Sequence, residues 1–126
     1  MLEISAIKER LRILFPGGHP DFIDLTIDEM ELHSKKNTEY TGAKGDPLGN
    51  FKRVAKIFEL YPNLRLTDPV VGALFHLMKQ LDATLRMLDQ EYEGQIEGKA
   101  ERLGDVSVYA KLARILVMEE NSDREV

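Results

Sequence analysis

The stretch TDPVVGALFHLMKQLDATLRMLDQE, residues 67–91, decides the fold of this chain. A proline directly after two capping-type residues predicts that a helix begins near residue 68, with Thr67 as its N-cap. The residues that follow are apolar around most of the helix circumference, which predicts a central and largely buried helix. A long central helix needs other helices to cover it, so this stretch favours a helical bundle.

Charged side chains interrupt this apolar helix at spacings of three, four and three residues, which places them on one helix face. They are Lys79, Asp82, Arg86 and Asp89. Charge on a packed face is costly unless it is paired, hydrogen-bonded or holding a ligand. Two interpretations are open: a stripe of intrahelical ion pairs, or a site in which Lys79 and Arg86 hold phosphates while Asp82 joins a metal site or orients the lysine.

A second polar series lies in the last predicted helix, residues 99–119. Glu101, Asp105 and Tyr109 follow one another at one-turn spacing, so they share a helix face. Two carboxylates at this spacing can share a divalent cation such as Mg²⁺. The alternative is a solvated acidic face, or ion pairs with Arg102 and Lys111.

The other helices are predicted at residues 2–14, 21–37 and 48–61, with turn residues at 15–20, 39–47, 62–63 and 93–98 between them. No strand is expected. The fold class is therefore all-α, a four- to five-helix bundle forming a single domain over residues 1–126. Residues 1–20 are expected to form an N-terminal helix and turn, 21–119 the helical core, and 120–126 a frayed tail. The packing side of the last helix is predicted to contain Leu103, Val106, Ala110, Ala113 and Val117.

The segment before the third helix is a third candidate region. Asp46 and Asn50 are candidate N-caps for that helix. Tyr40 and Phe51 either pack in the core or stack on a base. The histidines have no metal-ligand spacing and are expected to be structural or exposed; they are His19, His33 and His76.

Composition excludes several classes of function. The chain has no cysteine, which excludes disulfides and thiolate metal sites. Its 22 acids against 17 lysines and arginines disfavour binding to a nucleic-acid polymer, although a local group of cations can still hold a phosphorylated ligand. No run approaches the roughly 18 apolar residues of a membrane span, and the charged N-terminal segment does not resemble a signal peptide. We therefore expect a cytoplasmic protein without a membrane partner.

In their order and separation, these motifs resemble small phage-encoded members of the MazG-like all-α NTP pyrophosphohydrolase superfamily. The resemblance covers roughly residues 25–118 and rests on KKNTEY at 35–40, DPLGNF at 46–51, Lys79 and Arg86 in the long helix, and Glu101, Asp105 and Tyr109. It implies a bundle that forms dimers or dimers of dimers, with the site between helices. Active members resemble one another in holding Mg²⁺ with four acids and cleaving a nucleoside triphosphate to the monophosphate and pyrophosphate.

The resemblance assigns roles to residues of this chain. It implies that Asp82, Glu101 and Asp105 hold Mg²⁺ and act as catalytic residues. It implies that a nucleotide is bound by Lys35, Tyr40, Asn50, Phe51, Lys79, Arg86 and Tyr109. Phage encoding would place the protein in the host cytoplasm.

Two of the four expected acids are absent or shifted. The long helix has Lys79 three residues before Asp82, and Arg102 stands where a hydrolase more often has an acid. One expectation is therefore a Mg²⁺-dependent nucleotide pyrophosphohydrolase. Another is a degenerate relative that sequesters a nucleotide, such as a viral protein that binds a host immune signalling nucleotide, because Lys79 and Arg102 bind phosphate without metal. A third is a structural or protein-interaction module that needs no ligand.

Overall fold

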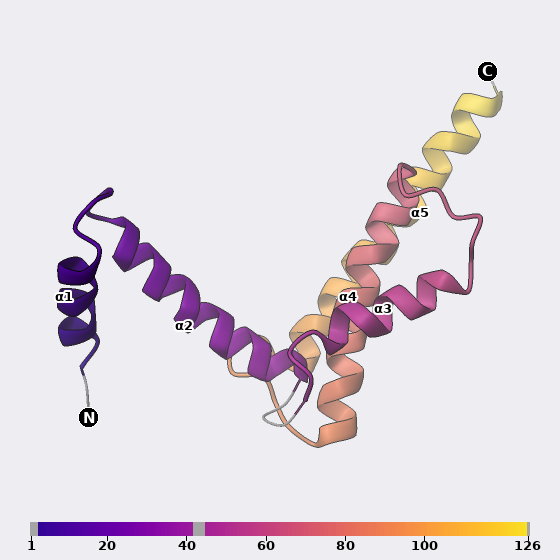
Figure 1. Ribbon diagram of the computed structural model, residues 1–126. Coiled ribbons are helices and arrows are strands. Elements are labelled where there is room, and N and C mark those ends of the chain that lie inside the picture. The colour runs from indigo at the N-terminus through magenta and orange to yellow at the C-terminus, as the bar shows by residue number, and fades with distance from the viewer. Residues whose placement is uncertain (1–2, 42–44, 126) are drawn as a thin grey trace. The chain divides into compact units, whose positions relative to one another are not determined.

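The chain folds into α-helices in the computed structural model, which describes residues 3–41 and 45–125. Those residues contain no strand and five helices: α1 (Ile4–Leu14), α2 (Phe22–Thr41), α3 (Gly49–Glu59), α4 (Pro69–Gln90) and α5 (Lys99–Glu125) (Figure 1). The predicted all-α class is confirmed. No helix in the described part of the chain is long and apolar enough to cross a membrane.

The helices divide into two compact units, Met1–Lys36 and Asn37–Val126, and the division falls inside α2. In the first unit, Lys8 and Arg12 of α1 both contact the carboxylate of Asp24 in α2, at 3.1 Å and 3.2 Å. None of the described residues from 3 to 36 is buried. Surface ion pairs, and not a hydrophobic core, therefore join α1 to the start of α2.

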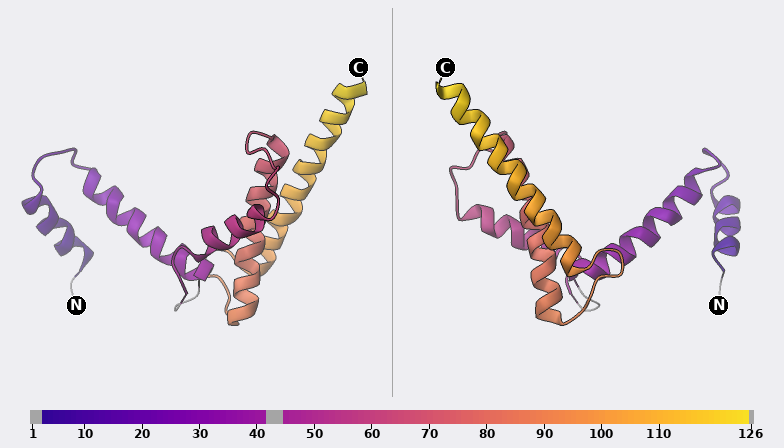
Figure 2. Two further views of the ribbon diagram at one scale, coloured as in Figure 1. Left: turned by 45° about the vertical axis from the view of Figure 1, so that its right-hand side comes forward. Right: turned by 180° about the vertical axis from the view of Figure 1, so that it is seen from behind.

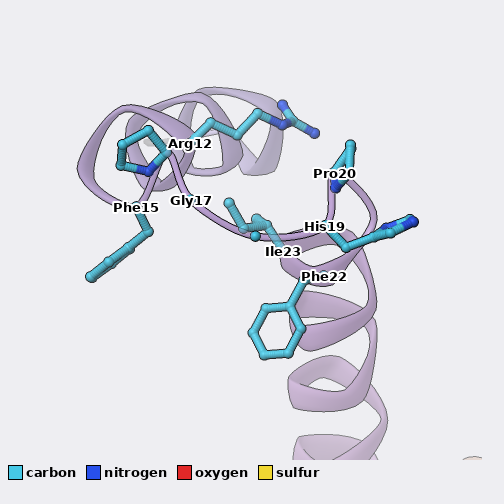
Figure 3. Close-up of a pocket in the computed structure, with 9 residues that line it drawn as sticks. Arg12, Phe15, Gly17, His19, Pro20, Phe22 and Ile23 are labelled. Atoms are coloured by element: carbon cyan, nitrogen blue, oxygen red, sulfur yellow. The ribbon is translucent and has the colours of Figure 1, made fainter.

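A hollow of about 590 Å³ lies at the turn between α1 and α2, lined by Arg12, residues 15–20, Phe22 and Ile23. Figure 3 shows the aromatic rings of Phe15 and Phe22 on one side of the turn and the guanidinium of Arg12 on the other. That guanidinium already donates to Asp24. None of the predicted site residues lines this hollow.

In the second unit α4 is the central helix, since it packs along α5 and against α3 (Figures 1 and 2). The buried apolar residues of this unit are Val54, Val71, Ala83, Met87 and Ala113. The predicted central position of α4 is confirmed, but its burial is less complete than predicted. Leu74, Phe75, Leu85 and Leu88 are 38–58% exposed, because two neighbouring helices cover only part of its circumference.

The start of α4 differs by one residue from the prediction. The N-cap is Asp68, whose carboxylate accepts a hydrogen bond from the backbone N–H of Val70 at 2.9 Å, so the assignment of Thr67 as cap is wrong. Pro69 occupies the first turn as predicted. The residue directly before that proline has extended backbone, which is the conformation an N-cap needs.

Two helices continue further than predicted. The backbone of α2 is helical to Thr41, so the expected loop over residues 39–47 begins later. The backbone of α5 is helical to Glu125, so the expected frayed tail from residue 120 is helical over its described part. Both extensions contain glutamate, a good helix former, and charge alone does not end a helix.

The packing face of α5 is rotated from the predicted one. Ala113 is buried as expected, but Leu103 and Val117 are 48% and 41% exposed. The most buried residue of α5 is instead Arg102, at 1% exposure. The ion pairs of this arginine, described below, face the inside of the unit and so turn the neighbouring Leu103 outward.

Two glycines provide a matched test of the packing of the connector between α4 and α5: Gly94 lies in the connector, and Gly104 lies in α5. A Cβ at Gly94 would lie 2.0 Å from the carbonyl oxygen of Glu97, so Gly94→Ala should force the backbone to move and destabilise the protein by about 1–3 kcal/mol. A Cβ at Gly104 meets nothing within 4 Å, so Gly104→Ala should stabilise helix α5 by about 0.5–1 kcal/mol. Urea unfolding measures both changes. Effects of the same sign would contradict this packing of the connector.

Candidate functional site

One face of α4 carries an aromatic half followed by a charged half. Its residues are spaced by three, four, three and four positions, which aligns them along the helix. We call them the α4 stripe: Gly72, Phe75, Lys79, Asp82 and Arg86. The last three are among the four charged residues that the sequence singled out on this helix; the fourth is Asp89.

Helix α3 lies against this stripe with opposite chain direction. The rings of Phe58 and Phe75 stack with centroids 5.9 Å apart. Seven residues further along α4, Asp82 contacts Arg53, which comes earlier in α3. These two contacts show that the aromatic and charged halves of the stripe both face α3.

The Arg53–Asp82 ion pair is bidentate. Nε of Arg53 donates to one carboxylate oxygen at 2.7 Å and Nη2 donates to the other at 2.8 Å. The side chain of Asp82 is 8% exposed and that of Arg53 is 36% exposed. The hydrogen bonds to Asp82 raise the pKa of Arg53 above its usual range. Both oxygens of Asp82 are therefore committed to a cation that the protein itself supplies.

Cations outnumber acids along the charged half of the stripe. Lys79 and Arg86 are half-buried, and Arg53 adds a third cation from α3. Arg86 also approaches Asp89 at 3.8 Å, but that carboxylate is 70% exposed, so the pair is weak. Lys79 and Arg86 on α4 and Arg53 on α3 thus lie around the buried carboxylate of Asp82. Lysine and arginine are the side chains that bind phosphate groups through charge-assisted hydrogen bonds.

The first turn of α3 contains two more of the predicted nucleotide-binding residues, Asn50 and Phe51. Asn50 is buried, whereas Phe51 is 60% exposed. The N-cap of α3 is Leu48 and no side chain caps the helix, so the prediction that Asp46 or Asn50 is the N-cap is wrong. Asp46 instead accepts a hydrogen bond from the backbone N–H of Leu48 at 2.9 Å, in the turn before the helix. A 2.7 Å hydrogen bond from Lys52 is the main cause of the lowered pKa of Asp46. Asp46 thus shapes the turn that places Asn50 and Phe51.

A second charged group is centred on Arg102, on the side of α4 that faces α5. Its Nη2 donates to Glu39 at 3.0 Å and its Nη1 donates to Gln80 at 2.8 Å. Glu97 lies 3.5 Å from the same guanidinium. The exposed fractions of Arg102 and Glu39 are 1% and 2%, which makes them a buried ion pair.

Glu39 also holds the connector between α4 and α5. One of its carboxylate oxygens accepts from the backbone N–H groups of Ile96 and Glu97. Its carbonyl oxygen accepts from the hydroxyl of Tyr92. Arg102, at the position where the resemblance leads one to expect an acid, therefore serves as the counterion of Glu39.

The sequence did not identify Glu39 or Gln80 as site residues. Glu39 was expected in a loop, and it lies 63 positions from Arg102 in the chain. Arg102 is one of several charged residues in α5, and their spacing does not show which of them turns inward or which partner it meets.

Contacts between α4 and α5 show which turns of α4 lie opposite the predicted residues Asp105 and Tyr109 of α5. Tyr109 stacks on His76 with ring centroids 5.4 Å apart, and Arg102 reaches Gln80. Asp105 lies midway between Tyr109 and Arg102, so it is level with the turn of α4 that contains Lys79. Asp105 is half-buried. Because Tyr109 stacks on His76, Tyr109 lies level with Phe75, the aromatic residue of the α4 stripe.

The described residues do not fit the magnesium site that the resemblance implies. Among them, no group of three or more His, Cys, Asp or Glu side chains is arranged to hold a metal ion. Both oxygens of Asp82 accept from Arg53, and Glu101 lies exposed in the first turn of α5. Coordination of Mg²⁺ by Asp82, Glu101 and Asp105 stays a prediction that would require a different arrangement of these side chains.

The two remaining predicted nucleotide-binding residues, Lys35 and Tyr40, belong to α2. Lys35 is exposed on α2 in the first unit, beside an open hollow that it shares with Met30, Glu31 and Ser34. Tyr40 has a described helical backbone, but its side chain lies outside the described part of the structure.

Comparison with other proteins adds no assignment. No protein-family model matches the chain, and neither a curated protein nor a solved structure matches it.

Proposed function

We propose that this chain is a nucleotide-binding protein of the MazG-like type that holds its ligand's phosphates with cations and does not require a metal. The observation that carries the proposal is the bidentate pair of Arg53 with Asp82 in the middle of the α4 stripe. A carboxylate held in this way cannot also coordinate Mg²⁺ through either oxygen without losing its arginine. Lys79 and Arg86, one turn to either side, supply the charge that the phosphates require.

The exposed apolar residues support a further part of this proposal, that the protein forms a homodimer or a tetramer. On α5, Val108, Leu112 and Ile115 are 46–52% exposed and are spaced by four and three residues, so they form a stripe. On α4, Leu85 and Leu88 are 55% and 58% exposed. A second copy that covers these residues would give α4 the burial that its sequence predicts.

The proposal is tested by incubating the full chain with a mixture of canonical and signalling nucleotides, once with Mg²⁺ and once with EDTA. Protein and solution are then separated, and both are analysed by mass spectrometry. We expect an intact nucleotide to travel with the protein in EDTA. Monophosphate and pyrophosphate that appear only with Mg²⁺ would favour the hydrolase instead. If neither retained nucleotide nor hydrolysis products are found under either condition, both functions are contradicted.

Substitutions then test the stripe directly. Lys79→Met and Arg86→Met each remove one charged donor, so each should weaken nucleotide binding about tenfold or more. Lys111→Met is the matched control, because Lys111 is exposed on α5 and bonds to Ser107. Isothermal titration calorimetry measures all three variants. Equal affinity of the Lys79 variant and the control would exclude the stripe as the phosphate site.

A further inference from the structure

A hollow of about 180 Å³ lies at the aromatic end of the α4 stripe. It is lined by Phe58, Leu66, Val71, Gly72, Phe75 and His76. Pockets that enclose a drug-sized ligand start at about 300 Å³. This hollow therefore has room for a ring system but not for a whole nucleotide, and the rest of any ligand must lie outside it.

Three of the six residues that line this hollow are aromatic, and their ring contacts continue to α5. Phe58 stacks on Phe75, Phe75 meets His76 edge to face, and His76 stacks on Tyr109. Planar heterocycles stack favourably on such rings whatever their sequence or identity. The ring nitrogens of His76 and the hydroxyl of Tyr109 add groups that can hydrogen-bond to the edge of a heterocycle.

The hollow and the cations of the stripe lie on successive turns of α4, and none of these cations lines the hollow itself. Phe75 and Lys79 are four residues apart, which places their Cβ atoms about 5–6 Å from each other. Arg86 lies a further seven residues along, about 10 Å in the direction of the helix axis. A ligand with its ring in the hollow would therefore extend its charged groups past Lys79 and Arg53 toward Arg86.

We propose that this hollow binds the base of the nucleotide whose phosphates lie along the charged half of the α4 stripe. This inference rests on the proposed function, and it names the part of the ligand that each half of the stripe recognises. It places the base against Phe58, Phe75 and His76, outside the two existing ring stacks, with Tyr109 behind His76. Phe51, which the sequence offered as a stacking residue, lies seven residues from Phe58 at the other end of α3.

Gly72 provides the test. A Cβ at Gly72 meets nothing within 4 Å, and Gly72 lines the hollow, so Gly72→Leu adds apolar atoms to the space proposed for the base. Gly104→Leu is the matched control, since Gly104 is also a helical glycine with open space around it and lies on α5. The probes are ATP, GTP, CTP and UTP, which carry a base, and inorganic triphosphate, which does not. Calorimetry gives the affinities, and circular dichroism with light scattering gives the fold and the mass of each variant.

We expect Gly72→Leu to weaken binding of the preferred nucleotide about tenfold or more and to leave the affinity for inorganic triphosphate unchanged. The control should alter neither affinity. Unchanged nucleotide binding by Gly72→Leu would overturn the base site while leaving the proposed function standing. Loss of self-association in that variant, with its nucleotide affinity intact, would assign the hollow to a second copy and also overturn it. If the unsubstituted chain binds neither the nucleotides nor triphosphate, the proposed function itself fails.

Discussion

Arg102→Met is expected to lower the free energy of unfolding by about 3–5 kcal/mol, the largest stability change of any substitution considered for this protein. The reason is that the carboxylate of Glu39, 2% exposed, would lose its buried counterion while remaining inside the fold. Taking a charge out of water is costly, and an unpaired one keeps that cost without the compensating attraction. Urea unfolding of the full chain measures the change.

A double-mutant cycle separates the ion pair from the rest of the arginine. Glu39→Gln removes the buried negative charge but keeps an oxygen for the backbone N–H groups of Ile96 and Glu97. The double variant of Glu39→Gln and Arg102→Met should therefore be more stable than Arg102→Met alone, because no unpaired charge remains. Additive effects of the two substitutions would show that the pair is not coupled.

Arg53→Met is expected to cost about 2–3 kcal/mol, whereas Asp82→Asn should cost only about 1 kcal/mol. The asymmetry follows from burial, since the side chain of Asp82 is 8% exposed and that of Arg53 is 36% exposed. Removing the arginine leaves a desolvated carboxylate, but removing the carboxylate leaves a guanidinium that water can reach. Chemical unfolding at neutral pH gives both values.

Lys52→Met is the control for Arg53→Met, since Lys52 is 63% exposed in its pair with Asp46. A control as unstable as Arg53→Met would contradict the interpretation.

The fold was predictable where local pattern is enough. Apolar spacing identified the five helices and the central place of α4, because the helix period depends only on residues three to four positions apart. The partners of charged residues were not predictable in the same way. For Asp82 the sequence offered intrahelical pairs with Lys79 and Arg86, but its bidentate partner is Arg53, 29 positions earlier on another helix. Only the packing of α3 on α4 brings these two side chains together.

The acidic residues of α5 show the same limit of sequence spacing, which identifies residues on one helix but not their partners on other helices. Spacing placed Glu101 and Asp105 one turn apart on α5, and they do lie on one helix. Spacing could not show that Arg102 between them turns inward to meet Glu39 and Gln80. Because that contact rotates α5 about its axis, it also decides which apolar residues of the helix stay exposed.

The contacts of Glu39 set an order for the assembly of the second unit. They join positions that are 57 and 63 residues apart, so closing them costs chain entropy that local helix formation does not. Ile96 and Arg102 occupy fixed positions for Glu39 only once α4 and α5 have paired, because both residues lie at the reversal between those helices. The last turns of α2 should therefore join the folded unit late, and their backbone amides should lose hydrogen-exchange protection before those in the middle of α4.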